Sequence, residues 1–143
     1  KLLVSIVTLN KPFDVMQSLL KQNKIDSGLV IFIDGITRVS ENTKIKNCLF
    51  IGSPEKLSDI SVAMDQAVKA LQTKDKFIFF DSINTLSVFN KPGTVAKFVY
   101  FLAGKIREWK VRGVIISIKK DADDSLIDEL TQFCDSRIDL GGN

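Results

Sequence analysis

The feature that most constrains the fold is a series of short apolar runs that do not alternate with polar residues. Rich in Val, Ile, Leu and Phe, they have the length of β-strands and span residues 2–7, 29–33, 48–51, 77–80, 114–118 and 137–140. Strands that are apolar throughout belong to a sheet covered on both faces. Between most of them, apolar residues recur with helical spacing, over 13–20, 54–71, 94–110 and 126–134. Residues 83–93 are expected to form a loop.

This alternation of strands and helices predicts an α/β fold, a three-layer sandwich with a mostly parallel sheet and helices on both faces. We expect four apolar side chains at the centre of the sheet, those of Val4, Ile31, Phe79 and Ile115. The length of 143 residues fits a single domain, 1–143.

Composition excludes several classes of function. The chain has no His, which excludes Ser-His-Asp and Cys-His nucleophiles and His-ligated metals. A net charge of +3 is too mild to indicate a nucleic-acid or membrane partner, and no apolar run approaches the ~18 residues of a membrane span. Cys48 and Cys134 form no CxxC motif and have apolar neighbours, so we expect buried free thiols in a reducing cytoplasm.

The residues that directly follow each strand are the candidates for a functional site, because ligands of open α/β sheets bind beyond the carboxyl ends of the strands. Asp81 follows the apolar run 77–80, which is the form of a Walker B strand, whose Asp holds Mg²⁺ through its water shell. An Asp in this position can equally be a structural acceptor for the next loop. Asp81 is therefore the candidate cofactor-binding residue, and no catalytic or metal-ligating residue is assigned.

Three weaker candidates have structural alternatives. Gly52-Ser53 precedes a helix and could bind phosphate, although Ser53 with Pro54 also reads as an ordinary helix start. An acidic cluster follows the fifth strand and could bind a metal or complement a helix dipole. Its members are Asp121, Asp123 and Asp124.

A receiver-like acidic pocket is the third candidate, formed by Asp34 and Asp81 with Lys119. The acidic pair expected after the first strand is absent, because residues 8–10 are Thr-Leu-Asn. Within the chain, neither a P-loop GxxxxGK[ST] nor a GxGxxG motif occurs.

Across its length the chain resembles the KaiC-like branch of the RecA superfamily, which is widespread in archaea. The most specific segment is FIFFDSINTL, in which Asp-Ser follows the apolar strand as in the Walker B region of that family. The resemblance assigns the Walker B position to Asp81. The segments that carry the resemblance are 4–12, 29–37, 47–54, 76–86 and 97–118.

The chain departs from the pattern of active KaiC-like ATPases at the residues that activate water. The Glu pair of that family corresponds to the stretch 8–11, where Asn10 cannot accept a proton and Lys11 is a cation. The P-loop and its strand would precede Lys1. The resemblance thus implies an inactive domain, without a cofactor, that serves as a regulatory or protein-interaction module. The alternative is the C-terminal portion of an active ATPase, with ATP and magnesium, whose P-loop lies upstream of Lys1.

The longest expected helix, 94–110, is the candidate interaction surface. Its apolar stripe is long enough to pack on the sheet, and Tyr100 and Phe101 lie beside that stripe. A wide sheet could cover both aromatic residues. If they are exposed instead, aromatic residues on a charged helix suit an interface core with a polar rim. We therefore expect a protein partner or self-association, with no membrane and no clear nucleic-acid partner.

Overall fold

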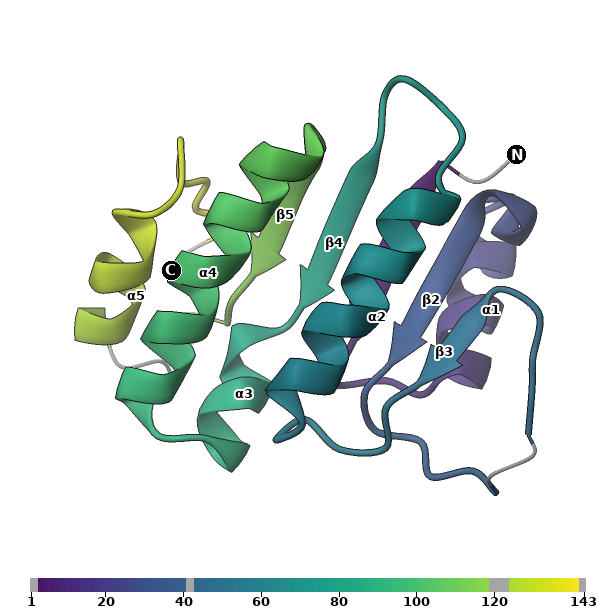
Figure 1. Cartoon of the computed structure of the whole chain (residues 1–143), viewed down its shortest axis with the longest axis horizontal. Coiled ribbons are helices and arrows are strands. Elements are labelled where there is room, and N and C mark those ends of the chain that lie inside the picture. Colours follow the sequence, from purple (N-terminus) through teal and green to yellow (C-terminus); the bar gives the residue numbers. More distant parts are fainter. Residues whose placement is uncertain (1–2, 41–42, 119–123, 142–143) are drawn as a thin grey trace.

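The computed structural model describes residues 3–40, 43–118 and 124–141 and contains a five-stranded, all-parallel sheet (Figure 1). The strands are β1 (Val4–Thr8), β2 (Val30–Asp34), β3 (Cys48–Phe50), β4 (Phe77–Asp81) and β5 (Arg112–Ile116). Their order across the sheet is β3-β2-β1-β4-β5. The expected α/β class and parallel sheet are confirmed.

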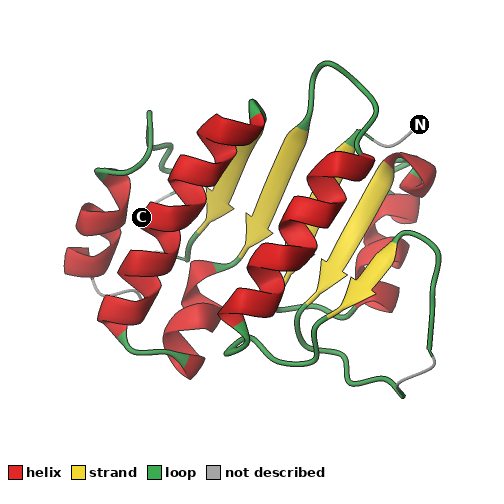
Figure 2. Ribbon diagram, in the orientation of Figure 1, coloured by secondary structure: helices red, strands yellow, loops and turns green. Residues whose placement is uncertain are grey.

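Helices lie on both faces of the sheet, as Figure 2 shows. The helices are α1 (Phe13–Gln22), α2 (Leu57–Ala70), α3 (Ile83–Phe89), α4 (Pro92–Trp109) and α5 (Asp124–Thr131), and a 3₁₀ turn spans Ser27–Leu29. Helices α2 and α4 cover one face and α1 covers part of the other, while α5 packs beside α4 on the β5 side of the molecule (Figure 1). Among the described residues, no helix is both long and apolar enough to cross a membrane.

The main core lies between the sheet and the layer of α2, α3 and α4. Its fully buried side chains include Phe80, Ile60 and Leu86, and Phe80 packs against Phe98 of α4 with ring centroids 5.8 Å apart. The apolar stripe expected on α4 does face this core. Its buried members are Val95, Phe98, Val99 and Leu102, with Ile106 and Trp109 partly buried.

On the opposite face of the sheet, α1 covers only the half that contains β2. There α1 packs Phe13 edge-on against Phe32, with centroids 5.1 Å apart, in a smaller cluster with Val30 and Cys48. No described helix covers the same face of β4 and β5. Phe79 is therefore only partly buried, and Val114 and Ile116 are 43% and 39% exposed. Ile115 lies on an edge strand, so its expected place at the sheet centre is wrong.

Three element assignments from the sequence are also wrong. Helix α2 begins at Leu57 rather than Pro54, because Gly52 adopts a left-handed φ of 88° and the chain turns once more before Lys56. Residues 83–89, expected in a loop, form α3. The segment 137–140 is not a strand, and Ile138 is 79% exposed, because no strand edge pairs with it.

Candidate functional site

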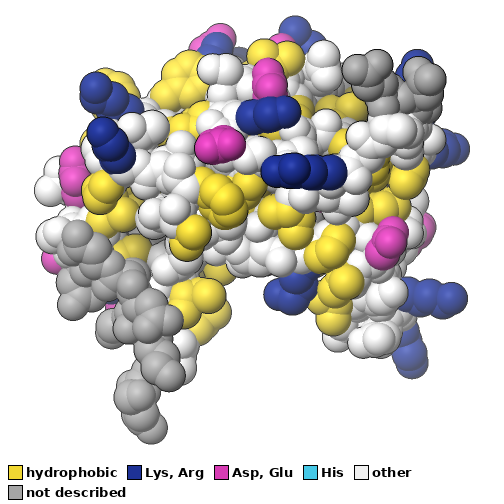
Figure 3. All heavy atoms as spheres, turned by 90° about the horizontal axis from the view of Figure 1, so that it is seen from below, with side chains coloured by type: hydrophobic (Ala, Val, Ile, Leu, Met, Phe, Trp, Pro, Cys, Tyr) yellow, Lys and Arg dark blue, Asp and Glu magenta, His cyan; other side chains and the backbone are white. Residues whose placement is uncertain are grey.

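The carboxyl ends of β1 and β4 form the topological switch point of the sheet. The chain moves from β1 through β2 to β3 on one side, then crosses to β4 and β5 on the other. In open α/β sheets, ligand sites occur at such points. Figure 3 views the molecule from below, onto the end where the strands terminate, and shows hydrophobic side chains exposed among charged ones.

At the switch point, Asn10 bridges the two strands. Its amide Nδ2 donates to Asp81 Oδ1 at 2.9 Å and to Ser82 Oγ at 3.0 Å. Its Oδ1 accepts a hydrogen bond from Thr85 Oγ1 of α3. The backbone joins the same loops, since Leu9 N donates to the carbonyl oxygen of Asp81 at 2.7 Å. The strand ends are therefore tied together by groups of the chain itself.

Helix α3 ties the next strand to this cluster through Asn84. The Oδ1 of Asn84 accepts from Ile118 N at 2.5 Å, and its Nδ2 donates to Ile118 O at 3.1 Å. The Asn84 side chain thus pairs with the backbone N–H and C=O of Ile118, just beyond β5, as the backbone of a neighbouring strand would. Together, Asn10, Asn84 and Thr85 link the ends of β1, β4 and β5 through α3.

Asp34, at the end of β2, is fully buried and saturated with hydrogen bonds. Its Oδ2 accepts from Phe13 N at 2.9 Å and from Thr37 Oγ1 at 2.5 Å. Its Oδ1 accepts from Ile36 N and Thr37 N at 2.9 and 2.8 Å. The carboxylate thus occupies the anion position at the N-terminus of α1 and holds the following loop. Its role is structural.

The other candidates from the sequence do not join this cluster. Thr8 lies between Asp34 and Asp81 in the sheet register, and each carboxylate has its own hydrogen-bond partners, so they do not form a shared acidic pocket. Ser53 is not the cap of α2, whose N-cap is Lys56. Lys119, Asp121 and Asp123 lie outside the described residues. Among the residues that the structure does describe, no group of three His, Cys, Asp or Glu side chains could hold a metal ion.

Asp81 has a hydrogen-bond partner within the chain. Its Oδ1 accepts from the amide N–H of Asn10 at 2.9 Å. Mg²⁺ prefers oxygen ligands and retains its water shell, so a Walker B Asp would contact the waters of the ion. Asp81 is half-buried at the switch point, where a Walker B residue is expected, and its cofactor-binding role stays a prediction.

The two thiols differ in their surroundings. Burial, and to a lesser extent the charge of Asp34, raises the pKa of Cys48 to about 12. Cys134 is exposed and its pKa is raised by partial desolvation and by Asp135. Neither thiol has the lowered pKa of a nucleophile. The expectation of buried free thiols is met by Cys48 and is wrong for Cys134.

One sequence family matches most of the chain. A profile described as a family of unknown function, DUF7504, matches residues 30–140, from the start of β2 to the end of the described segment after α5. The chain belongs to the DUF7504 family. No curated protein sequence matches the chain significantly. The matched residues include Asp81, Asn84 and Thr85, whereas Asn10 precedes the matched region.

Asn10, Asn84 and Thr85 are the site residues that the sequence did not assign to the cluster. From the sequence, Asn10 is recognisable only as the residue that replaces a catalytic Glu. Asn84 and Thr85 lie in a segment that the sequence predicts to be a loop. A signal was present in retrospect, because Ser82 precedes an apolar pair spaced as one helical face, Ile83 and Leu86. That spacing is too short to distinguish one helical turn from a loop.

Proposed function

We propose that this chain is a KaiC-like domain that does not hydrolyse ATP and that acts as a protein-interaction module. The observation that carries the proposal is the hydrogen bond from Asn10 Nδ2 to Asp81 Oδ1. A water-activating Glu at this place would accept a proton, whereas the Asn10 amide cannot, and here it donates a hydrogen bond to Asp81.

The interaction role is supported by the aromatic surface of α4. Tyr100 and Phe101 are 67% and 46% exposed, although α4 already buries a complete apolar stripe against the sheet. Tyr100 packs edge-on against Phe133, with ring centroids 5.2 Å apart. Aromatic side chains of this kind form the centres of protein interfaces.

A second function is favoured by the open side of the sheet. Among the described strands β5 pairs only with β4, so its other edge is unpaired, and its residues Val114 and Ile116 are exposed on the uncovered face of the sheet. Such an edge accepts a further strand. The alternative, the C-terminal portion of an ATPase whose P-loop lies upstream of Lys1, requires one more strand in this sheet.

The two functions are separated by a nucleotide assay on the longest natural chain. Steady-state phosphate release and a thermal shift with ATP·Mg²⁺ would be measured for that chain and for Asp81→Ala. The interaction module predicts no turnover and no stabilisation, whereas a competent site at a hundredfold excess of ligand over Kd adds about 2.7 kcal/mol. Turnover that Asp81→Ala abolishes would establish the ATPase instead.

A further inference from the structure

The outward side of α4 carries a narrow stripe directly opposite its buried face. Its members recur at spacings of four, three and four residues, which places them on one line along a helix. All four are exposed. In chain order they are Lys97, Phe101, Gly104 and Glu108.

Gly104 is the unexplained member of this stripe. It lies in the interior of an 18-residue helix, where glycine is less stable than alanine. No contact with the described part of the chain requires it, because a Cβ added there would meet no described atom within 4 Å. A glycine on an exposed helix surface allows the backbone of another helix to approach closely.

We propose that this stripe is the contact surface for a second copy of the chain, with the two α4 helices antiparallel about a two-fold axis. If the axis passes between Leu102 and Ala103, Phe101 of each copy lies against Gly104 of the other. The same register places Lys97 opposite Glu108 at both ends of the contact. This inference rests on the proposed function, since it names the partner of that interaction surface.

The charges of the stripe select this orientation. Lys97 has no ion pair among the residues that the structure describes, and Glu108 makes only an exposed contact of 3.5 Å with Lys105. An antiparallel pair joins unlike charges twice, whereas a parallel pair would set Lys97 beside Lys97 and Glu108 beside Glu108. The stripe is therefore complementary to itself in one orientation, as a two-fold interface requires.

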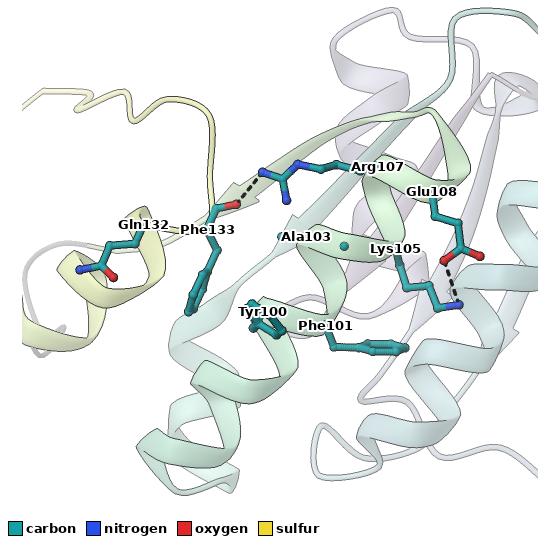
Figure 4. A pocket seen from close by; sticks show the side chains of 9 residues that line it. Tyr100, Phe101, Ala103, Lys105, Arg107, Glu108, Gln132 and Phe133 are labelled. Carbon is teal, nitrogen blue, oxygen red and sulfur yellow. Dashed lines mark hydrogen bonds and ion pairs between the residues drawn. The ribbon is translucent and has the colours of Figure 1, made fainter.

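A shallow groove, lined in part by Phe101, Gly104 and Glu108 of the stripe, enlarges the contact surface. It lies between α4 and the turn after α5, has a volume of about 530 Å³, and contains Tyr100, Gln132 and Phe133 along its floor and rim. In Figure 4, Tyr100 and Phe133 point toward one another on one side of α4 while Phe101 and Lys105 extend on the other. The Lys105 Nζ lies 5.7 Å from the Phe101 ring centroid. Aromatic rings thus flank Gly104 on both sides, and the charged groups lie around them.

Sedimentation velocity of the full chain, at concentrations up to about 1 mM, tests the proposal, since small interfaces dissociate in this range. We expect a monomer–dimer equilibrium for the natural sequence. Gly104→Ala should raise the melting temperature of the monomer and weaken the dimer about tenfold, because the methyl group occupies the space of the Phe101 ring. Gly93→Ala is the matched control: its Cβ is equally unobstructed, and its opposite position lies beyond the end of α4.

Charge reversal provides a second, independent test. Lys97→Glu and Glu108→Lys should each weaken the dimer about tenfold, and the double variant should restore it, because both inter-chain pairs are then reversed together. Lys74→Glu, an exposed loop residue with the same change of charge, should leave dimerisation unchanged.

A chain that stays monomeric over the whole range overturns the proposal, as does a dimer that Gly104→Ala and the single charge reversals leave unchanged. Neither result affects the nucleotide assay, so failure of this contact and failure of the proposed function are distinguishable. A dimer that both reversals weaken but the double variant does not restore would overturn the antiparallel register.

Discussion

The side-chain amide of Asn10 donates a 2.9 Å hydrogen bond to the carboxylate of Asp81, across the two strands at which the sheet changes direction. Asn10 is exposed and Asp81 is half-buried, so this hydrogen bond lies at the surface of the switch point, not in its interior. The group that would bind a cation in an ATPase is thus used to hold two loops together.

Replacing Asn10 by Asp should convert this contact into a repulsion between two carboxylates. We expect Asn10→Asp to lower the free energy of unfolding at pH 7 by about 1–2 kcal/mol, and Asn10→Ala by about 1 kcal/mol. Like charges raise the folded-state pKa of the carboxyl pair, so the excess loss should disappear as the pH falls below the unfolded-state value of about 4. Urea unfolding of both variants at pH 7 and at about pH 3 measures this, and an excess loss that does not change with pH would contradict it.

Asp34 should be among the most sensitive positions of the chain. Asp34→Asn retains one acceptor oxygen for four donors and directs an amide N–H₂ at the others, so we expect a loss of about 2–4 kcal/mol. The matched control is Asp26→Asn, at an exposed residue whose Oδ1 accepts a hydrogen bond from Gly28 N. Thermal unfolding should separate the two variants by several degrees, and equal losses would show that the buried network is not formed.

Phe79 and Phe80 are adjacent in β4 and point to opposite faces of the sheet, so substituting each tests how well its face is covered. Phe80 is completely buried under α4, and Phe80→Ala should cost about 3–5 kcal/mol. Phe79 faces the half of the sheet that no described helix covers, and Phe79→Ala should cost about 1–2 kcal/mol. Chemical denaturation of both variants tests this difference. A cost for Phe79→Ala as large as that for Phe80→Ala would indicate that another segment covers this face.

The two thiols should react at different rates. Cys134 is exposed and should be alkylated by iodoacetamide in the folded chain, whereas Cys48, with a pKa raised to about 12, should be labelled only after unfolding. Because the folded-state pKa of Cys48 is raised, the folded state retains a proton that the unfolded state loses above about 9. Stability should therefore fall as the pH rises above that value, and less so in Cys48→Ala. Mass spectrometry of labelled peptides and unfolding curves between pH 8 and 10 provide the measurements.

The α/β class and the parallel sheet could be predicted from the sequence, and the reason is local. Runs such as 29–33 and 77–80 are apolar at every position, which requires a sheet with burial on both sides. The stripe of α4 was equally predictable, because the period of a helix determines which residues share a face. The exposure of Tyr100 and Phe101 depended on the width of the sheet, which only the tertiary structure decided.

Strand order, edges and the partners of polar groups were decided by the tertiary structure. Nothing local distinguishes Ile115, on an edge strand, from Ile31, next to the central strand, since both lie in β-branched runs. Asp34 and Asp81 both follow apolar strands and look alike in the sequence. The carboxylate of Asp34 accepts hydrogen bonds from the loop after it and from the start of α1. That of Asp81 accepts one from Asn10, 71 positions away in the loop after β1. The local pattern specifies which faces of each element are apolar, because periodicity is a property of neighbouring residues. The role of a polar side chain instead depends on donors and acceptors that only the folded chain brings together.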